Sequence, residues 1–74
     1  MVTITETRDD QTKNLVIVNT TEDAEAFLDV LAGRYWGTPG FKAKRDGDKL
    51  IVSAQVVGEG WRVSSTYHAV PDAA

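Results

Sequence analysis

The residues best able to support chemistry are the single histidine and the hydroxyl side chains before it. Ser64, Thr66 and His68 alternate along the chain, so on a strand all three would lie on one face. A hydrolase needs a nucleophile, a base and an orienting acid that converge from different elements around an oxyanion site. Three residues on one strand face do not provide this arrangement, and we expect a protein that is not an enzyme.

Carboxylates could in principle complete a metal site around the histidine. Because the chain has no cysteine, His68 would need Asp46, Asp48 and Glu59 to converge on it from separate turns. The sequence DGD at residues 46–48 resembles a fragment of a calcium loop, but it lacks the spaced ligands and the distal glutamate. A type I′ hairpin turn explains this triplet better. We therefore expect no metal and no cofactor.

Charge is distributed unevenly along the chain. The formal net charge of −3 and the pI of about 4.9 argue against general affinity for nucleic acid or for an anionic membrane. Residues 20–33 contain four carboxylates and no basic residue. Glu22, Glu25 and Asp29 are spaced to share one helix face. They form either a solvated outer surface or an acidic ridge that receives a basic partner.

A basic segment follows the acidic one. Residues 34–49 contain five basic residues and two acids, and Lys42, Lys44 and Arg45 form its basic patch. Lysines that alternate on a strand near aromatic residues are typical of sheets that bind single-stranded nucleic acid. The density of positive charge is low for a groove that follows phosphates, and lysines on an edge strand also prevent aggregation. Nucleic-acid binding is therefore an alternative and not the leading interpretation.

The elements that must position these residues follow from the hydrophobic pattern. A period of two with many β-branched residues predicts strands, and a period near 3.6 predicts one amphipathic helix after residue 20. The order ββαβββ indicates an α+β fold, a small and mostly antiparallel sheet with the helix packed on one face. Residues 8–14 form a turn, and LVIV at 15–18, apolar on both faces, indicates a central strand. The predicted strands span residues 2–6, 15–18, 41–45, 49–57 and 61–70.

The helix ends are marked by threonine and glycine. Thr20 or Thr21 is the expected N-cap. Gly33 supplies a left-handed stop, or the helix continues to Trp36 before Gly37 ends it.

Alternation along each strand assigns its residues to faces. On the last strand it predicts that Trp61, Val63, Tyr67 and Ala69 meet the helix, together with Ser65. The opposite face is expected to stay open. Its predicted residues are Lys42, Lys44, Ile51, Ser53, Gln55, Val57, Arg62, Ser64, Thr66 and His68.

The segment RYWGTPGF at residues 34–41 combines three aromatic residues with a Gly-Pro corner. Tyr35 continues the apolar stripe of the helix, and Phe41 begins the next strand in its core-facing register. Trp36 points away from that stripe. It is either an interface anchor or a lid folded over the end of the sheet.

These observations favour a binding protein. A chain of 74 residues forms a single domain, 1–74, with a frayed tail at 71–74, and its lack of cysteine and of a long apolar segment indicates a cytoplasmic protein without a membrane span. We expect a non-catalytic protein-binding module, such as a small bacterial or phage accessory, inhibitor or immunity protein. A binder of single-stranded nucleic acid and a structural homodimer that buries its open sheet face are the alternatives. The predicted partner-binding residues are Trp36, Ile51, Val57, Arg62 and His68.

Overall fold

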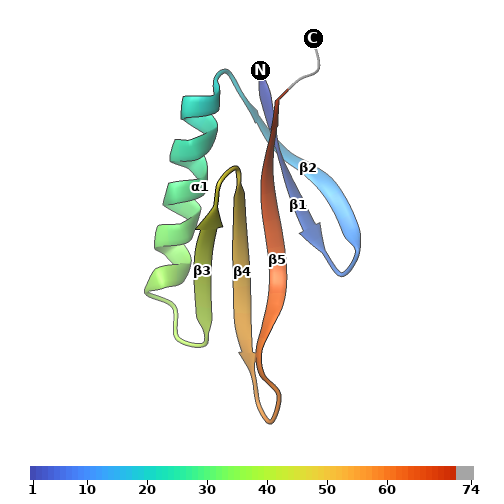
Figure 1. The fold of residues 1–74 in the computed structure, drawn as a ribbon, viewed down its shortest axis with the longest axis vertical. Coiled ribbons are helices and arrows are strands. Elements are labelled where there is room, and N and C mark those ends of the chain that lie inside the picture. The colour runs from blue at the N-terminus through green and yellow to red at the C-terminus, as the bar shows by residue number, and fades with distance from the viewer. Residues whose placement is uncertain (72–74) are drawn as a thin grey trace.

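The computed structural model describes residues 1–71 and contains the predicted order of elements (Figure 1). One antiparallel sheet has the strand order β2-β1-β5-β4-β3, and one helix packs on it. The predicted α+β fold is confirmed. The elements are β1 (Val2–Arg8), β2 (Gln11–Val18), α1 (Thr21–Trp36), β3 (Phe41–Asp46), β4 (Lys49–Val56) and β5 (Gly60–Pro71).

The first hairpin is longer than the sequence pattern indicates. Asp9 and Asp10 both adopt positive φ, 52° and 65°, and form a two-residue turn in which Arg8 pairs with Gln11. Such a turn matches the twist of the flanking strands, so pairing begins directly beside it. The prediction of a turn over residues 8–14 was wrong in its length, because a run of polar residues does not prevent an exposed strand.

The strand β2 lies at the edge of the sheet. The prediction of a central strand, which was made from its apolar residues, was wrong. Ile4 pairs with Val16 and Thr5 pairs with Asn14, which leaves Leu15 as an extra, unpaired residue. An extra residue shifts the alternation of side chains. The four residues of LVIV are all apolar because the bulge shifts the alternation within them, and not because both faces of β2 are buried.

The helix begins at the predicted cap and ends at the later of the two predicted positions. The amide of Asp23 donates to Thr20 Oγ1 at 3.1 Å, which satisfies one of the free amides of the first turn. The helix runs through Gly33 to Trp36, and Gly37 caps it. A glycine costs a helix only about 1 kcal/mol, which the tertiary contacts of the last turn offset.

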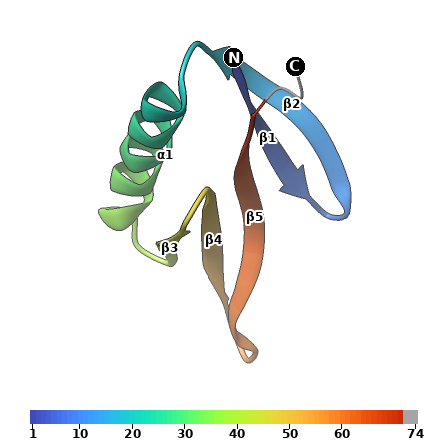
Figure 2. The ribbon, with the colours of Figure 1, turned by 45° about the horizontal axis from the view of Figure 1, so that its top comes forward.

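The core lies between the helix and one face of the sheet (Figure 2). Ala24 and Leu28 of α1 are fully buried, as are Ile4 of β1 and Leu50 and Val52 of β4. Partly buried side chains, among them Phe27, Leu31 and Tyr35, surround this cluster. The buried apolar residues are Val2, Ile4, Ala24, Leu28, Leu50, Val52, Tyr67 and Ala69.

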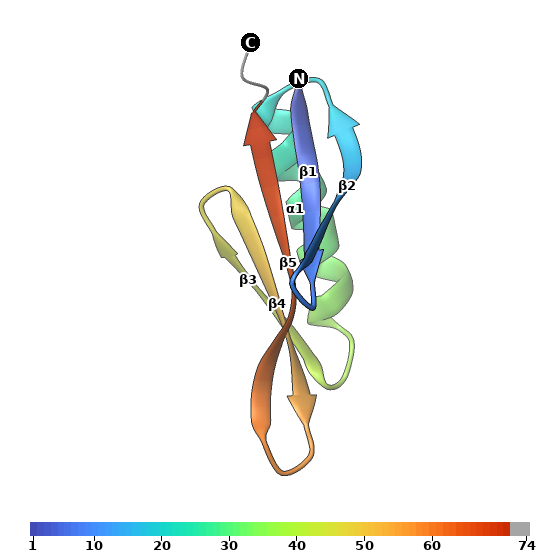
Figure 3. The ribbon, with the colours of Figure 1, turned by 90° about the vertical axis from the view of Figure 1, so that its right-hand side faces the viewer.

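The two ends of the described chain lie side by side, because Val2 pairs with Pro71. Pro71 is thus the last residue of β5 and not part of a tail, and the other residues of the predicted tail, 72–74, lie outside the described residues. At the opposite end, the β4–β5 hairpin extends past the C-terminal end of α1 (Figures 1 and 3). The described molecule is elongated, with extents of 46 × 25 × 17 Å.

Candidate functional site

No element of residues 1–71 covers the face of the sheet opposite α1 (Figure 2). Residues paired across antiparallel strands project from the same face, so the register defines this surface. We call it the open face. Its residues are Thr3, Thr5, Thr7, Thr12, Asn14, Ile17, Lys42, Lys44, Asp46, Lys49, Ile51, Ser53, Gln55, Trp61, Val63, Thr66, His68 and Val70.

A bulge in β5 decides which residues reach the open face. Ser65 pairs with Val52 and Val63 pairs with Ser53, so Ser64 has no partner on β4. One extra residue inverts the alternation on its N-terminal side. The predicted face of every β5 residue before Ser64 was therefore wrong.

Three side chains change face because of this bulge. Trp61 and Val63 were predicted to meet the helix, but they lie on the open face with 45% and 64% of their surfaces exposed. Arg62 was predicted on the open face, but it is paired with Ala54 on the other one. Its guanidinium binds Glu59 at 3.1 Å. Arg62 therefore does not belong to the open face.

Lys42 and Trp61 contact each other on the open face. The Lys42 ammonium lies over the indole ring, 4.6 Å from its centroid. A cation in this position is attracted by the electron-rich face of the ring. The contact spans from β3 to β5 across β4.

Three groups of side chains can be distinguished on the open face. Lys42 and Lys44 form the basic edge on β3, and Ile51, Trp61 and Val63 form an apolar patch on β4 and β5. The third group consists of hydroxyl side chains. These threonines are Thr3, Thr5 and Thr7 of β1, Thr12 of β2 and Thr66 of β5.

His68 lies on the open face but is already engaged by the β3–β4 turn. Its Nε2 donates to Asp48 Oδ2 at 2.9 Å, and the amide of Ala69 donates to the Asp48 carbonyl at 2.9 Å. The hydrogen bond from His68 lowers the pKa of the Asp48 carboxyl below its ordinary value. His68 thus fastens the turn to β5 and is not a free side chain for a partner.

The acids of the hypothetical metal site lie in different places. Asp46 is opposite Lys49, Asp48 binds His68, and Glu59 belongs to the β4–β5 turn at the other end of the sheet. Residues 1–71 contain no group of three or more side chains placed to hold a metal ion. In the DGD turn only Gly47 has a positive φ, 61°, which corresponds to type II′ and not to the predicted type I′.

Arg45 does not belong to the basic patch in which the sequence placed it. It projects toward the helix, where its guanidinium pairs with Asp29 and donates to the carbonyl oxygens of Glu25 at 3.4 Å and Gly47 at 2.9 Å. Odd and even residues of β3 face opposite sides, which separates Arg45 from Lys42 and Lys44. Arg45 therefore connects α1 to the β3–β4 hairpin.

The ion pair between Arg45 and Asp29 also removes one free carboxylate from the acidic ridge of Glu22, Glu25 and Asp29. Asp29 is held by Arg45, so Glu22 and Glu25 remain as its carboxylates without an ion pair within residues 1–71. They lie on the helix, on the side of the molecule opposite Lys42 and Lys44. The two charged regions thus occupy opposite sides.

The other predicted partner-binding residues are scattered. Trp36, 83% exposed, lies at the end of α1, and it is not folded over the sheet. Val57 is fully exposed in the β4–β5 turn, whereas Ile51 is half-buried on the open face, opposite Lys44 of β3. The sequence missed Trp61 and Val63, since no local signal marks the bulge that exposes them.

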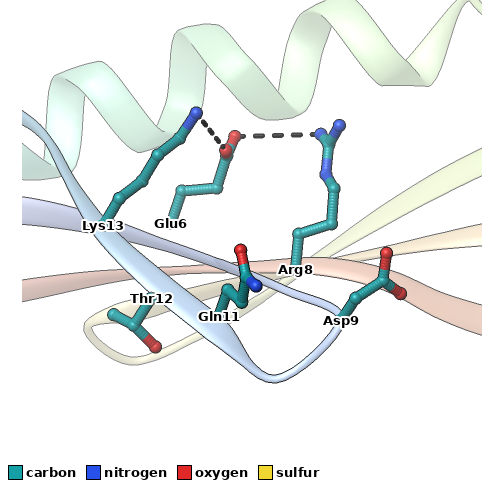
Figure 4. A pocket seen from close by; sticks show the side chains of 6 residues that line it. All are labelled: Glu6, Arg8, Asp9, Gln11, Thr12 and Lys13. Atoms are coloured by element: carbon teal, nitrogen blue, oxygen red, sulfur yellow. Dashed lines mark ion pairs between the residues drawn. The ribbon is translucent and has the colours of Figure 1, made fainter.

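An open hollow of about 370 Å³ lies beside the β1–β2 hairpin, on the face that carries the helix (Figure 4). Glu6 projects into it and pairs with Lys13 at 3.4 Å and with Arg8 at 3.8 Å. A hydrogen bond from Tyr67 lowers the pKa of Glu6. The charges of this hollow neutralise one another, so it offers a ligand little unpaired charge. Its lining residues are Glu6, Arg8, Asp9, Gln11, Thr12 and Lys13.

Comparison with known protein families, with curated proteins and with solved structures finds no match for this chain. Within residues 1–71, no helix combines the length and the apolar character that crossing a bilayer requires.

Proposed function

We propose that this protein is a non-catalytic protein-binding module whose contact surface is the open face. One observation carries the proposal: Trp61 and Val63 stand exposed beside Ile51 on a sheet face that no element of residues 1–71 covers. Tryptophan is enriched among the residues that dominate binding energy, and interfaces surround such anchors with a polar rim. The lysines of β3 and the threonines of β1 form such a rim.

The setting of this surface also supports binding rather than catalysis. The apolar patch is carried by paired antiparallel strands, so its backbone is already ordered before a partner binds. The kind of protein that we propose is an accessory, inhibitor or immunity protein of a bacterial or phage cytoplasm, a reducing compartment with which a sequence without cysteine is compatible.

The contact surface can be mapped with a photo-crosslinking amino acid placed at one position at a time. At Val63 it would lie on the open face, at Val30 on the exposed outer side of α1, and at Trp36 at the helix end. We expect protein adducts in cells of the source organism from position 63 and not from position 30. Adducts from position 36 alone would contradict the open face as the contact surface and would indicate the Trp36 corner instead.

The same experiment separates the two alternatives. Adducts between two copies of the chain, together with a dimeric mass by sedimentation, would indicate a homodimer that buries the open face. Adducts with nucleic acid, and binding to oligonucleotides that weakens steeply with salt, would indicate a nucleic-acid binder. Either result would contradict the proposed function.

A further inference from the structure

The charges of the open face indicate the chemistry of its partner, provided that this face is the contact surface proposed above. Within residues 1–71, Lys42 and Lys44 have no carboxylate within ion-pairing distance. Asp46, the acid of this face, and Asp48 of the adjoining β3–β4 turn lie at one end of it. Asp48 binds His68 there. In the rows of paired residues that contain the apolar patch, Lys42 and Lys44 are the charged side chains, and Asp46 lies one row nearer the β3–β4 turn, opposite Lys49.

The opposite side of the molecule carries the carboxylates of α1. An exposed surface of one sign attracts and orients a partner of the other sign, and it disfavours partners of its own sign. A second copy that docks open face to open face would place the basic edges of both copies in one interface. Charge thus favours an acidic partner over self-association.

The contact between Trp61 and Lys42 favours a protein partner over single-stranded nucleic acid. Sheets that bind single strands stack successive bases on several exposed aromatic rings. On the open face of residues 1–71, Trp61 is the only tryptophan, tyrosine or phenylalanine, and the Lys42 ammonium covers its ring. A base could stack there only after displacing the lysine. Carboxylates could bind Lys42 and Lys44 without disturbing this contact.

We propose that the open face binds an acidic, extended protein segment, with carboxylates on Lys42 and Lys44 and an apolar side chain on the patch of Ile51, Trp61 and Val63. The two lysines are alternate residues of one strand, so their backbones are about 6.6 Å apart. Alternate residues of an extended segment have the same spacing. Carboxylates at every second position would therefore match both lysines at once.

Fluorescence of Trp61 provides the direct test. In a Trp36→Phe background, Trp61 is the only tryptophan, and Trp36 is exposed enough to be replaced without loss of the core. The acidic probe is a blocked peptide in which glutamate alternates with threonine around one central leucine. The control probes are the same peptide with lysine in place of glutamate and a short oligodeoxythymidine.

We expect saturable binding of the acidic peptide that weakens as salt rises. Lys44→Glu should weaken it about tenfold or more, whereas Arg34→Glu, the same charge change on the helix, should alter it less than about twofold. Circular dichroism will confirm that both variants are folded, and Lys44→Gln will provide a milder change at the same site. An intermediate loss with Lys44→Gln is expected.

Other outcomes would overturn the proposal. They are equal binding of the lysine peptide, equal weakening by Arg34→Glu, no binding of the acidic peptide, or tighter binding of the oligodeoxythymidine. If the acidic peptide fails while position 63 still crosslinks to a protein, the acidic partner is excluded but the proposed function stands. If position 63 yields no protein adduct, the proposed function itself fails.

Discussion

Tyr67 and Glu6 illustrate how single residues of this fold couple stability to pH. Tyr67 is buried beneath the helix, and Glu6 is opposite it on β1. Burial, together with hydrogen bonds to Tyr35 and Glu6, raises the pKa of the Tyr67 hydroxyl above its ordinary value. The folded state therefore favours the neutral Tyr67 hydroxyl. The resulting stabilisation is fully present at any pH below the pKa that this hydroxyl has in the unfolded chain.

This coupling predicts a loss of stability in alkaline solution. Above about pH 10, Tyr67 ionises in the unfolded chain but not in the folded one, so the free energy of unfolding should fall as pH rises. Tyr67→Phe should cost about 0.5–1.5 kcal/mol at neutral pH and should reduce the alkaline loss. Urea denaturation between neutral pH and pH 11 measures both effects. An identical alkaline loss in the variant would contradict the assignment.

Arg45 is the second residue whose role can be measured. Its side chain is mostly buried, and its guanidinium donates to two backbone carbonyls besides Asp29, whose own side chain is largely exposed. Arg45→Ala should cost about 1–3 kcal/mol, because carbonyls lose a charged donor. Asp29→Ala should cost less than about 1 kcal/mol, as is usual for an exposed ion pair. Equal losses in denaturation would show that the ion pair, and not the backbone contacts, connects the helix to the hairpin.

At the scale of the elements, the bulge at Ser64 determines which side chains the β4–β5 hairpin presents to solvent. The hairpin extends beyond the helix (Figure 3). The side chains in the N-terminal part of β5 can therefore change face without entering the core. This makes the bulge accessible to a direct test.

Deletion of Ser64 should restore simple alternation and move Trp61 off the open face. In the Trp36→Phe background, Lys42→Ala should change the emission of Trp61 when Ser64 is present, because it removes the cation above the ring. The same substitution should have no effect after the deletion. A persistent effect of Lys42→Ala in the deletion variant would show that the bulge does not set the face of Trp61.

At the scale of the whole molecule, the core is small for the length of the chain. The helix covers one side of the sheet only, and eight apolar residues are buried within residues 1–71. A domain of this size has little stability in reserve, so a bound partner would add appreciably to it.

Truncation of one core side chain should therefore have a large effect. Leu50 of β4 is fully buried in the core, and Leu50→Ala should cost about 2–5 kcal/mol. That is comparable to the total stability of about 5 kcal/mol expected at the lower end for small domains. Thermal melts followed by circular dichroism should show a greatly lowered midpoint. Val30→Ala, on the exposed side of α1, is the matched control and should leave the midpoint nearly unchanged.

The sequence by itself determined the elements of this protein and their order. Periodicity, the Thr20 cap and the turn residues act over a few neighbouring positions, so they can be read locally, and the α+β fold followed from them. The positions of Lys42, Lys44 and Ile51 on the open face followed as well, because no bulge interrupts the pairing of β3 with β4.

Only the tertiary structure decided the strand order and the faces of Trp61, Arg62 and Val63. No turn or glycine signal in the sequence marks Leu15 or Ser64 as a bulge. Each residue lacks a partner because of the register in which its strand pairs with another strand. Register is fixed by the summed burial of all paired side chains, a long-range quantity. Therefore the side that each β5 residue faces, and with it the composition of the open face, could not be obtained from one strand alone.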